Sequence, residues 1–304
     1  TDIRSLRLGG LELSDSSAAL YRLGGLSEAA GRLQQGLLGH DVLHRFTVEI
    51  DYPTRRVRLY DPAAYRYGGP GHSVPFTPDA DLPLLGATIK VPGRRAVTAR
   101  LLLDTGASGL CLILTTPFVV EHDLTRVRPA LEAPIGTGLV GELHGTIVRL
   151  EALELGRLRV RSPTTGLGGE NKGFLGRTDI DGVVGNAVFE GSRLIVDYAR
   201  RRIIVERRAS EGAACDYDMS GLRLVARGPA LRQLVVAYVV PHSPSADAGI
   251  RAGDELLRVD GRGVADQDLS AVRRELRVDG ALRQLVLRRE ADTVRVALRL
   301  RRLL

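Results

Sequence analysis

The sequence is poor in several kinds of residue, and each shortage argues against a class of protein. It contains no tryptophan, and aromatic residues make up only 4% of its 304 residues. Proteins that bind single-stranded nucleic acid stack the bases on aromatic side chains, so this scarcity argues against nucleic acid as a partner. No apolar run approaches the roughly 18 residues that a membrane-spanning helix needs. We therefore expect no transmembrane segment.

Lysine is almost absent, because only Lys90 and Lys172 occur, so arginine carries nearly all of the net charge of +7. A basic balance can indicate binding to nucleic acid or to a membrane surface. Here the arginines are spread along the predicted strands and helices with few aromatic residues between them. We interpret them as solvated surface residues.

Cysteine is equally scarce. Cys111 and Cys215 are too few for a disulfide framework, and neither belongs to a cluster with the spacing of metal ligands. Cys111 lies in an apolar run, which predicts a buried core thiol.

The most informative feature that is present is the segment Leu101–Ser108, which reads Leu-Leu-Leu-Asp-Thr-Gly-Ala-Ser. Three apolar residues predict a buried strand that delivers Asp104 to a tight turn of small residues. Acids are rarely buried without a partner, so this aspartate needs an explanation. One explanation is structural, because an aspartate can cap its own turn through the backbone.

The chain also contains an internal repeat. The segments Gly36–Leu43, Val48–Tyr52 and Arg55–Leu59 resemble Gly182–Phe189, Leu194–Tyr198 and Arg201–Val205, which lie 146 positions further on. Two glycines, an Asp-Tyr pair and the apolar alternation recur without a gap. This similarity predicts that residues 1–208 hold parts of two homologous modules.

Only the second of these modules has an Asp-Thr-Gly segment. The repeat places the matching segment of the first module about 42 residues before Thr1. We therefore expect the chain to be a truncated or processed form of a longer protein.

The repeat also bears on the only histidines with helical ligand spacing, His40 and His44. Their counterparts in the second copy are Asn186 and Glu190, which predicts surface residues rather than a metal site. We expect no metal or organic cofactor.

Short alternating stretches before residue 208 predict a mainly β region. The glycine-rich stretch Gly166–Gly173 does not lead into a helix as a phosphate-binding loop should, so we predict a mobile surface loop. After Glu211 the pattern changes to strand-like runs with one helical segment, Asp268–Leu276, which predicts a separate small α+β domain.

The residues around Asp104 suit one kind of chemistry. Two aspartates about 3 Å apart cannot both ionise, so they share one proton and can activate a water molecule. The ionised acid accepts a proton from the water while the protonated acid donates to the carbonyl oxygen of the substrate. Thr105 and Ser108 could orient the acid through their hydroxyls, and Gly106 permits a close backbone approach.

These motifs resemble those of bacterial aspartic proteases of pepsin-like and retropepsin-like fold. The resemblance implies that Asp104 is catalytic, with Thr105, Gly106 and Ser108 in its turn. It also implies that an apolar-apolar-glycine segment packs beside this turn and that a glycine-rich hairpin, Ile135–Gly141, covers the cleft. The substrate-binding residues implied in this way are Gly136, Thr137, Gly138, Val183, Val184 and Gly185.

The segment Ser243–Asp254, followed by Val259–Gly261, resembles a bacterial PDZ domain. This resemblance implies capture of a peptide carboxy-terminus as a strand added beside a helix. Its carboxylate would bind at Ser220, Gly221, Leu222, Arg223 and Leu224, with Val272 as a further wall of the apolar pocket. A domain that only packs against the protease part is the alternative.

The complete prediction is a mainly β chain with pepsin- or retropepsin-like β-barrel lobes, one partial and one complete, followed by a small α+β PDZ domain. The predicted ranges are 1–62, 63–210 and 211–304. The predicted function is an aspartic endopeptidase that acts on polypeptide substrates, with the second aspartate upstream of this chain.

A catalytically inactive, protease-like scaffold that acts through its PDZ domain is the alternative function. A homodimer that pairs two copies of Asp104 ranks below a two-lobed monomer, because the half-lobe at the N-terminus would obstruct that contact. The family resemblance favours an exported or cell-envelope location.

Overall fold

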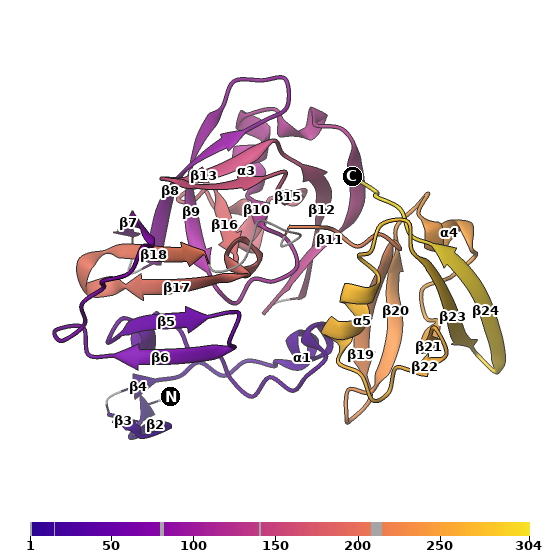
Figure 1. Cartoon of the computed structure of the whole chain (residues 1–304), viewed down its shortest axis with the longest axis horizontal. Coiled ribbons are helices and arrows are strands. Elements are labelled where there is room, and N and C mark those ends of the chain that lie inside the picture. Colours follow the sequence, from indigo (N-terminus) through magenta and orange to yellow (C-terminus); the bar gives the residue numbers. More distant parts are fainter. Residues whose placement is uncertain (1, 15, 80–81, 140, 208–214) are drawn as a thin grey trace.

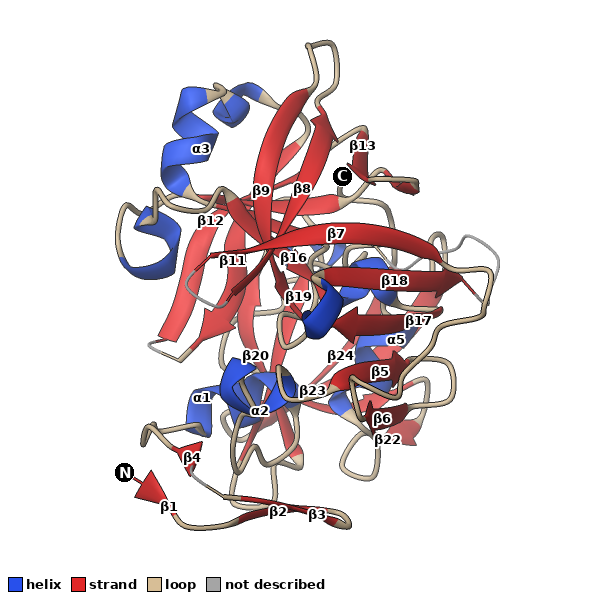
Figure 2. Cartoon of the chain, turned by 90° about the vertical axis from the view of Figure 1, so that its left-hand side faces the viewer, coloured by secondary structure: helices blue, strands red, loops and turns tan. Residues whose placement is uncertain are grey.

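The computed structural model describes residues 2–14, 16–79, 82–139, 141–207 and 215–304. Most of the regular structure is β, as predicted, and it falls into a large mixed sheet and a smaller C-terminal antiparallel sheet (Figures 1 and 2). The predicted boundary between residues 210 and 211 lies outside the described residues.

The large sheet contains 14 strands and runs in the order β11-β12-β15-β10-β16-β9-β8-β7-β18-β17-β5-β6, with β13 and β14 branching from β8. Its strands are β5 (Thr47–Asp51), β6 (Arg56–Tyr60), β7 (His72–Asp79), β8 (Leu82–Lys90), β9 (Val97–Asp104), β10 (Leu112–Leu114), β11 (Ala130–Gly138), β12 (Gly141–Arg149), β13 (Ala152–Leu155), β14 (Leu158–Arg161), β15 (Thr164–Gly168), β16 (Gly182–Gly185), β17 (Ser192–Asp197) and β18 (Arg202–Arg207).

No closed barrel is detected in the described part of the chain, whereas barrel-shaped lobes were predicted. The long strand β7 pairs with β8 through Phe76–Asp79 and with β18 through His72–Pro75. It thereby carries one continuous sheet from the strands around β9 to the strands around β5 (Figure 2).

Short helices and two small hairpins complete this part of the chain. They are β1 (Asp2–Ile3) with β4 (Ser16–Ser17), β2 (Leu6–Leu8) with β3 (Leu11–Leu13), the α-helices α1 (Gly24–Ala30), α2 (His40–Leu43) and α3 (Thr116–Glu121), and the 3₁₀ turns η1 (Leu124–Arg126), η2 (Gly173–Gly176), η3 (Asn186–Phe189) and η4 (Tyr198–Arg200).

The C-terminal sheet has six strands and two helices. They are β19 (Leu222–Arg227), β20 (Gln233–Val239), α4 (Pro244–Asp247), β21 (Glu255–Val259), β22 (Arg262–Gly263), α5 (Leu269–Glu275), β23 (Leu282–Arg289) and β24 (Asp292–Arg299). Helix α5 confirms the predicted helical segment. Its apolar residues Leu269 and Val272 are buried, as helical spacing requires.

Strands β5 and β17 from the two similar sequence segments pair with each other in antiparallel fashion. Glu49 lies opposite Ile195, its own counterpart 146 positions further on, and Val48 lies opposite Val196 while Ile50 lies opposite Leu194. Because of this register, a local two-fold axis through the Glu49–Ile195 pair relates one segment to the other. Figure 1 shows the resulting stack of β18, β17, β5 and β6.

The stretch Gly166–Gly173 is not a mobile surface loop over its whole length, because residues 164–168 form the fully buried strand β15. Glycine is needed there for packing. A Cβ atom on Gly166 would lie 2.9 Å from Ile135, and one on Gly168 would lie 2.8 Å from the hydroxyl of Thr116. The sequence shows the glycines but does not reveal these neighbours.

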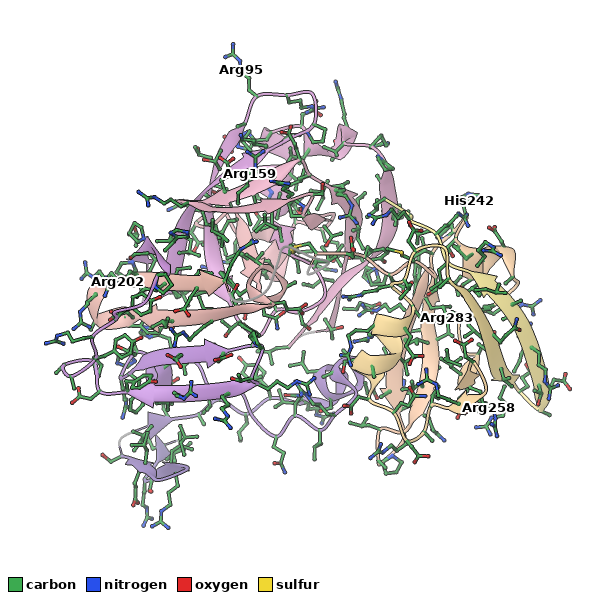
Figure 3. All side chains as sticks on the ribbon, in the orientation of Figure 1. Arg95, Arg159, Arg202, His242, Arg258 and Arg283 are labelled. Carbon is green, nitrogen blue, oxygen red and sulfur yellow. A yellow bond between two sulfur atoms is a disulfide. The ribbon has the colours of Figure 1, made fainter. Side chains whose placement is uncertain are left out.

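The arginines largely behave as expected from the sequence. Arg95, Arg159 and Arg258 are exposed and extend from different parts of the molecule (Figure 3). Other arginines, among them Arg223 and Arg273, instead take part in the contacts described below.

The prediction of a free thiol at Cys111 is wrong. Cys111 forms a disulfide with Cys215, with the two Cα atoms 5.7 Å apart. The backbone of Cys111 also accepts a hydrogen bond from Gly185 and donates one to Thr164. The bond therefore joins the framework around the Asp104 turn to the segment that enters the C-terminal domain.

Replacing both cysteines with serine is expected to lower the free energy of unfolding by roughly 3–5 kcal/mol, because the bond closes a long loop in the unfolded chain. Chemical denaturation of the two proteins measures the difference. A reducing agent should lower the denaturation midpoint of the wild type and leave that of the double variant unchanged. Equal midpoints for the oxidised and reduced wild type would contradict this expectation.

Candidate functional site

Strand β9 positions Asp104 at its carboxyl end. Leu101 and Leu103 point into the core, whereas Leu102 and Asp104 lie on the opposite face and are only partly buried. Alternation along the strand therefore brings the carboxyl group to the surface of the sheet while two leucines anchor the strand beneath it.

One carboxylate oxygen of Asp104 caps the turn that follows. Its Oδ1 atom accepts hydrogen bonds from the backbone N–H groups of Gly106, at 2.8 Å, and Ala107, at 3.2 Å. No hydrogen bond to Oδ2 is found within the described residues. The same side chain thus holds the turn with one oxygen and leaves the other available.

Strand β16 lies between β9 and β10, parallel to β9 and antiparallel to β10. Gly185 sits opposite Asp104 in the parallel pair. A Cβ atom at Gly185 would lie 2.9 Å from the carbonyl oxygen of Leu110 and 3.0 Å from that of Ala107. Only glycine fits at this place without displacing the Asp104 turn.

Val183 and Val184 occupy the core rather than a substrate-binding surface. They are 5% and 0% exposed, and they pair with residues of β9 and β10. Their role in this structure is to hold the two strands on either side of the Asp104 turn.

The other residues of the turn are placed differently from one another. Thr105 accepts a hydrogen bond at its carbonyl oxygen from the amide of Asn186, at 3.4 Å. Ser108 is exposed, and no hydrogen bond of its hydroxyl is found within the described residues. Asn186 is not among the site residues predicted from the sequence. Its position directly after Gly185 is the signal that could have found it.

Strands β11 and β12 form a long hairpin, the 130–149 hairpin, which contains Gly136, Thr137 and Gly138. Gly136 approaches Ile113 of β10, because a Cβ atom there would lie 3.5 Å from the Ile113 side chain. Ile135 packs in one cluster with Leu110, which follows the Asp104 turn. The base of the hairpin thus adjoins the turn. Val140 lies outside the described residues.

Of the predicted carboxylate-binding residues of the C-terminal domain, Ser220 and Gly221 lie in the loop before β19, and the other three are the first residues of that strand. Gly221 has a φ of 82° and lies so close to Ser243 that a Cβ atom would be 2.1 Å from its hydroxyl. Leu222 and Leu224 are 6% and 1% exposed and belong to the core of the domain together with Val272.

Asp218, which is not among the residues predicted from the sequence, occupies this loop. Its Oδ1 atom accepts hydrogen bonds from the backbone N–H groups of Ser220 (2.9 Å), Gly221 (2.6 Å) and Leu222 (3.2 Å) and from the Ser220 hydroxyl (2.6 Å). Burial raises the pKa of Asp218 to about 6, although these hydrogen bonds favour the ionised form. The sequence signal was an aspartate two residues before a Ser-Gly pair.

The C-terminal domain also contacts the 130–149 hairpin. The Arg223 side chain donates a hydrogen bond to the hydroxyl of Thr137, at 2.8 Å, and forms an ion pair with Glu142, at 2.8 Å. The Tyr238 hydroxyl donates to the carbonyl oxygen of Glu132, at 3.0 Å. The two predicted binding elements, hairpin and carboxylate loop, are thus linked through one arginine.

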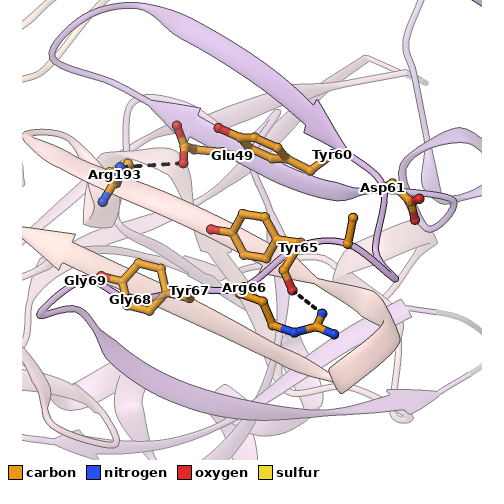
Figure 4. A pocket seen from close by; sticks show the side chains of 10 residues that line it. Glu49, Tyr60, Asp61, Tyr65, Arg66, Tyr67, Gly68, Gly69 and Arg193 are labelled. Carbon is orange, nitrogen blue, oxygen red and sulfur yellow. Dashed lines mark hydrogen bonds and ion pairs between the residues drawn. The ribbon is translucent and has the colours of Figure 1, made fainter.

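A separate pocket lies over the polar face of β5 and β17 (Figure 4). Glu49 pairs there with Arg58 at 2.5 Å and with Arg193 at 3.7 Å, and the Tyr67 hydroxyl donates to Glu206 at 2.8 Å. Because these charged groups already pair with one another, the pocket reads as a structural network rather than as a ligand site.

Within the described residues, no group of three or more histidine, cysteine, aspartate or glutamate side chains is placed to hold a metal ion. In the same part of the chain, no helix combines the length and the apolar character required to cross a membrane.

Comparison with known families identifies the C-terminal part of the chain. Residues 235–289 match the family of PDZ domains. A PDZ domain therefore lies near the C-terminus, and it implies binding of a peptide ligand. No curated protein matches the chain.

The solved structures that are similar to parts of the chain include three proteins with different partial overlaps. A photosystem II D1 C-terminal processing protease shares 28% identity over 29% of this chain and 24% of its own, with a TM-score of 0.27. The HtrA3 PDZ domain bound to a phage-derived ligand shares 26% identity over 27% of this chain and 83% of its own, with a TM-score of 0.24.

The third is a retropepsin-like aspartic protease from Rickettsia conorii. It shares 18% identity over 46% of this chain and 96% of its own, with a TM-score of 0.27. This is a distant structural match over about half of the chain. The chain spans about a quarter of the length of the photosystem II protease.

Replacing Gly185 with alanine is expected to lower the free energy of unfolding by about 2–3 kcal/mol, because the methyl group meets two carbonyl oxygens. Gly86 of β8 is a matched control, since a Cβ atom there would meet nothing within 4 Å. Its alanine variant should stay within about 0.5 kcal/mol of the wild type. Urea denaturation compares the three proteins, and equal losses for both variants would contradict the packing argument.

The stability of the Asp218→Asn variant relative to the wild type is expected to rise between pH 4 and pH 6. The folded-state pKa of Asp218 lies above its unfolded value, so the folded wild type holds the extra proton in this window and loses stability as pH increases. The change should reach roughly 2–3 kcal/mol. Unfolding of both proteins across this range measures it, and parallel curves would count against it.

Proposed function

We propose that the chain is the larger part of a two-lobed aspartic endopeptidase in which Asp104 is one of two catalytic acids. In this proposal residues 63–210 form a complete retropepsin-like lobe, and residues 1–62 supply the closing half of the other lobe. The PDZ domain, residues 211–304, binds a peptide or a partner protein.

The observation that carries this proposal is the register of β5 and β17. Pairing of Glu49 with Ile195 relates the two similar segments by a local two-fold axis. If the first lobe also has an Asp-Thr-Gly turn, the same axis would place its aspartate opposite Asp104. Two homologous modules related in this way explain both the sequence similarity and the register.

Within the described residues, no strands flank the first segment as β9 and β10 flank its counterpart. Leu37 and Leu38 are 58% and 50% exposed, whereas their counterparts Val183 and Val184 are buried between β9 and β10. Exposed apolar residues between two glycines indicate a surface that other strands could cover. We infer that the strand bearing the second aspartate docks on Gly36–Gly39, just as β9 docks on Gly182–Gly185.

The edge of β6 supports the same inference. Val57 is 63% exposed, whereas its counterpart Ile203 is fully buried and pairs with Val74 of β7. Strand β6 ends the path of the large sheet within the described residues. In this proposal a strand equivalent to β7 would bury Val57 and would belong to the other half of the first lobe.

The chemistry then follows from two facing aspartates. They share one proton, because two ionised carboxylates cannot lie side by side. The ionised acid accepts a proton from a bound water molecule, which attacks the peptide carbonyl carbon while the protonated acid donates to the carbonyl oxygen. In this scheme Oδ1 of Asp104 keeps its turn contacts, and Oδ2 is the atom available to the water.

Asp104→Asn is expected to lower peptide hydrolysis by the full-length natural polypeptide about a thousandfold or more. Its thermal unfolding midpoint should stay close to that of the wild type, because the amide oxygen can still accept both turn hydrogen bonds. Cleavage of a denatured protein substrate between pH 3 and pH 8 measures the activity.

Asp61→Asn is the matched control. The Oδ1 atom of Asp61 also accepts from the N–H two residues on, that of Ala63, at 2.8 Å. If Asp104 serves only as a turn cap, the two variants will cleave alike and the proposal fails. Absence of cleavage by the wild type at every pH, together with binding of carboxy-terminal peptides, would favour a protease-like scaffold instead.

A further inference from the structure

The backbone N–H groups of the carboxylate loop already have a partner in this chain. Those of Ser220, Gly221 and Leu222 all donate to one carboxylate oxygen of Asp218. A cluster of successive N–H groups is a binding place for an anionic oxygen, and a PDZ domain uses such a cluster for the carboxylate of its ligand. Asp218 offers the loop the same functional group that a peptide terminus would bring.

The groove beyond the loop is also closed by the chain. Its two walls are β19 and α5. The Arg273 side chain of α5 donates to the carbonyl oxygen of Leu224 in β19, at 2.6 Å. This hydrogen bond takes a backbone acceptor that an added peptide strand would use.

Helix α1 lies against the same two walls. It packs on β19, and Glu28 pairs with Arg227 of that strand. Gly31, just after the helix, lies so close to α5 that a Cβ atom would be 2.5 Å from that of Leu269. Figure 1 shows α1 between the large sheet and the C-terminal domain, next to α5 and β19.

We propose that the chain itself holds its PDZ groove shut, with the Asp218 carboxylate in the place of a ligand carboxylate. A peptide with a free carboxyl terminus then binds only by displacing Asp218 and by releasing Arg273 from Leu224. Two carboxylates thus compete for one set of donors. The apparent association constant for a free peptide is the intrinsic constant multiplied by the fraction of molecules whose groove is open.

Opening of the groove would reach the 130–149 hairpin through Arg223. This residue follows the loop directly, and its side chain holds Thr137 and Glu142. A change in β19 therefore alters contacts at the hairpin beside the Asp104 turn. The consequence for cleavage depends on the proposed endopeptidase function, whereas the occupation of the loop does not.

Chemical rescue tests the occupied loop without any activity assay. Asp218→Ala removes the internal carboxylate, so the loop N–H groups lose their hydrogen-bond acceptor. The variant should therefore unfold at a lower temperature than the wild type. Sodium acetate, and more strongly N-acetylvaline, should then raise the unfolding midpoint of the variant by several degrees. Sodium chloride at equal ionic strength and N-acetylvaline amide should not.

Two controls give the outcome its meaning. The wild type should show no such rise, because its loop is filled, and neither should Asp216→Ala, which removes a neighbouring carboxylate that pairs with Arg149. A lack of rescue in Asp218→Ala, or an equal rise in the wild type, overturns the proposal.

A second measurement serves if Asp218→Ala does not fold. Asp218→Leu keeps much of the side-chain volume but has no oxygen to accept the loop hydrogen bonds, so it should not compete with an external carboxylate. Titration with N-acetylvaline, followed at the amide resonance of Gly221, should give at least a tenfold lower dissociation constant for the variant than for the wild type. Equal constants overturn the proposal.

Discussion

The arrangement around Asp104 depends on one packing constraint, the passage of β16 between β9 and β10. The backbone at Ala107 and Leu110 can approach Gly185 closely only because glycine has no side chain. The parallel pairing with β9 then sets Gly185 beside Asp104, and the antiparallel pairing with β10 continues to Cys111. The turn, the hairpin base and the disulfide all attach to these three strands.

Two carboxylates in different parts of the molecule accept hydrogen bonds from successive backbone N–H groups. Asp104 caps its turn with one oxygen and keeps the other oxygen outside that arrangement. Asp218 instead sits with one oxygen in a full set of four donors. The carboxyl group of Asp104 is partly exposed at a strand end, as the proposed catalytic role requires. The carboxyl group of Asp218 is held within a loop, as the proposed closure of the groove requires.

The sequence could predict those features whose causes are local. The strand before Asp104, its tight turn and helix α5 follow from apolar spacing and turn residues within a few positions. The partnership of Cys111 with Cys215 could not be predicted, because the two residues are 104 positions apart and share no pattern. Val183 and Val184 are apolar in either role, and only their burial distinguishes a framework residue from a contact with substrate.

The disulfide changes what a cut in the backbone would do. Every peptide bond between Cys111 and Cys215 lies inside the loop that this bond closes. A single nick anywhere in that span therefore leaves two fragments that remain covalently joined. The C-terminal domain would stay tethered to the strand after the Asp104 turn, and the two pieces would separate only on reduction. In an oxidising compartment, where such bonds persist, the molecule would tolerate internal cleavage without losing its PDZ domain.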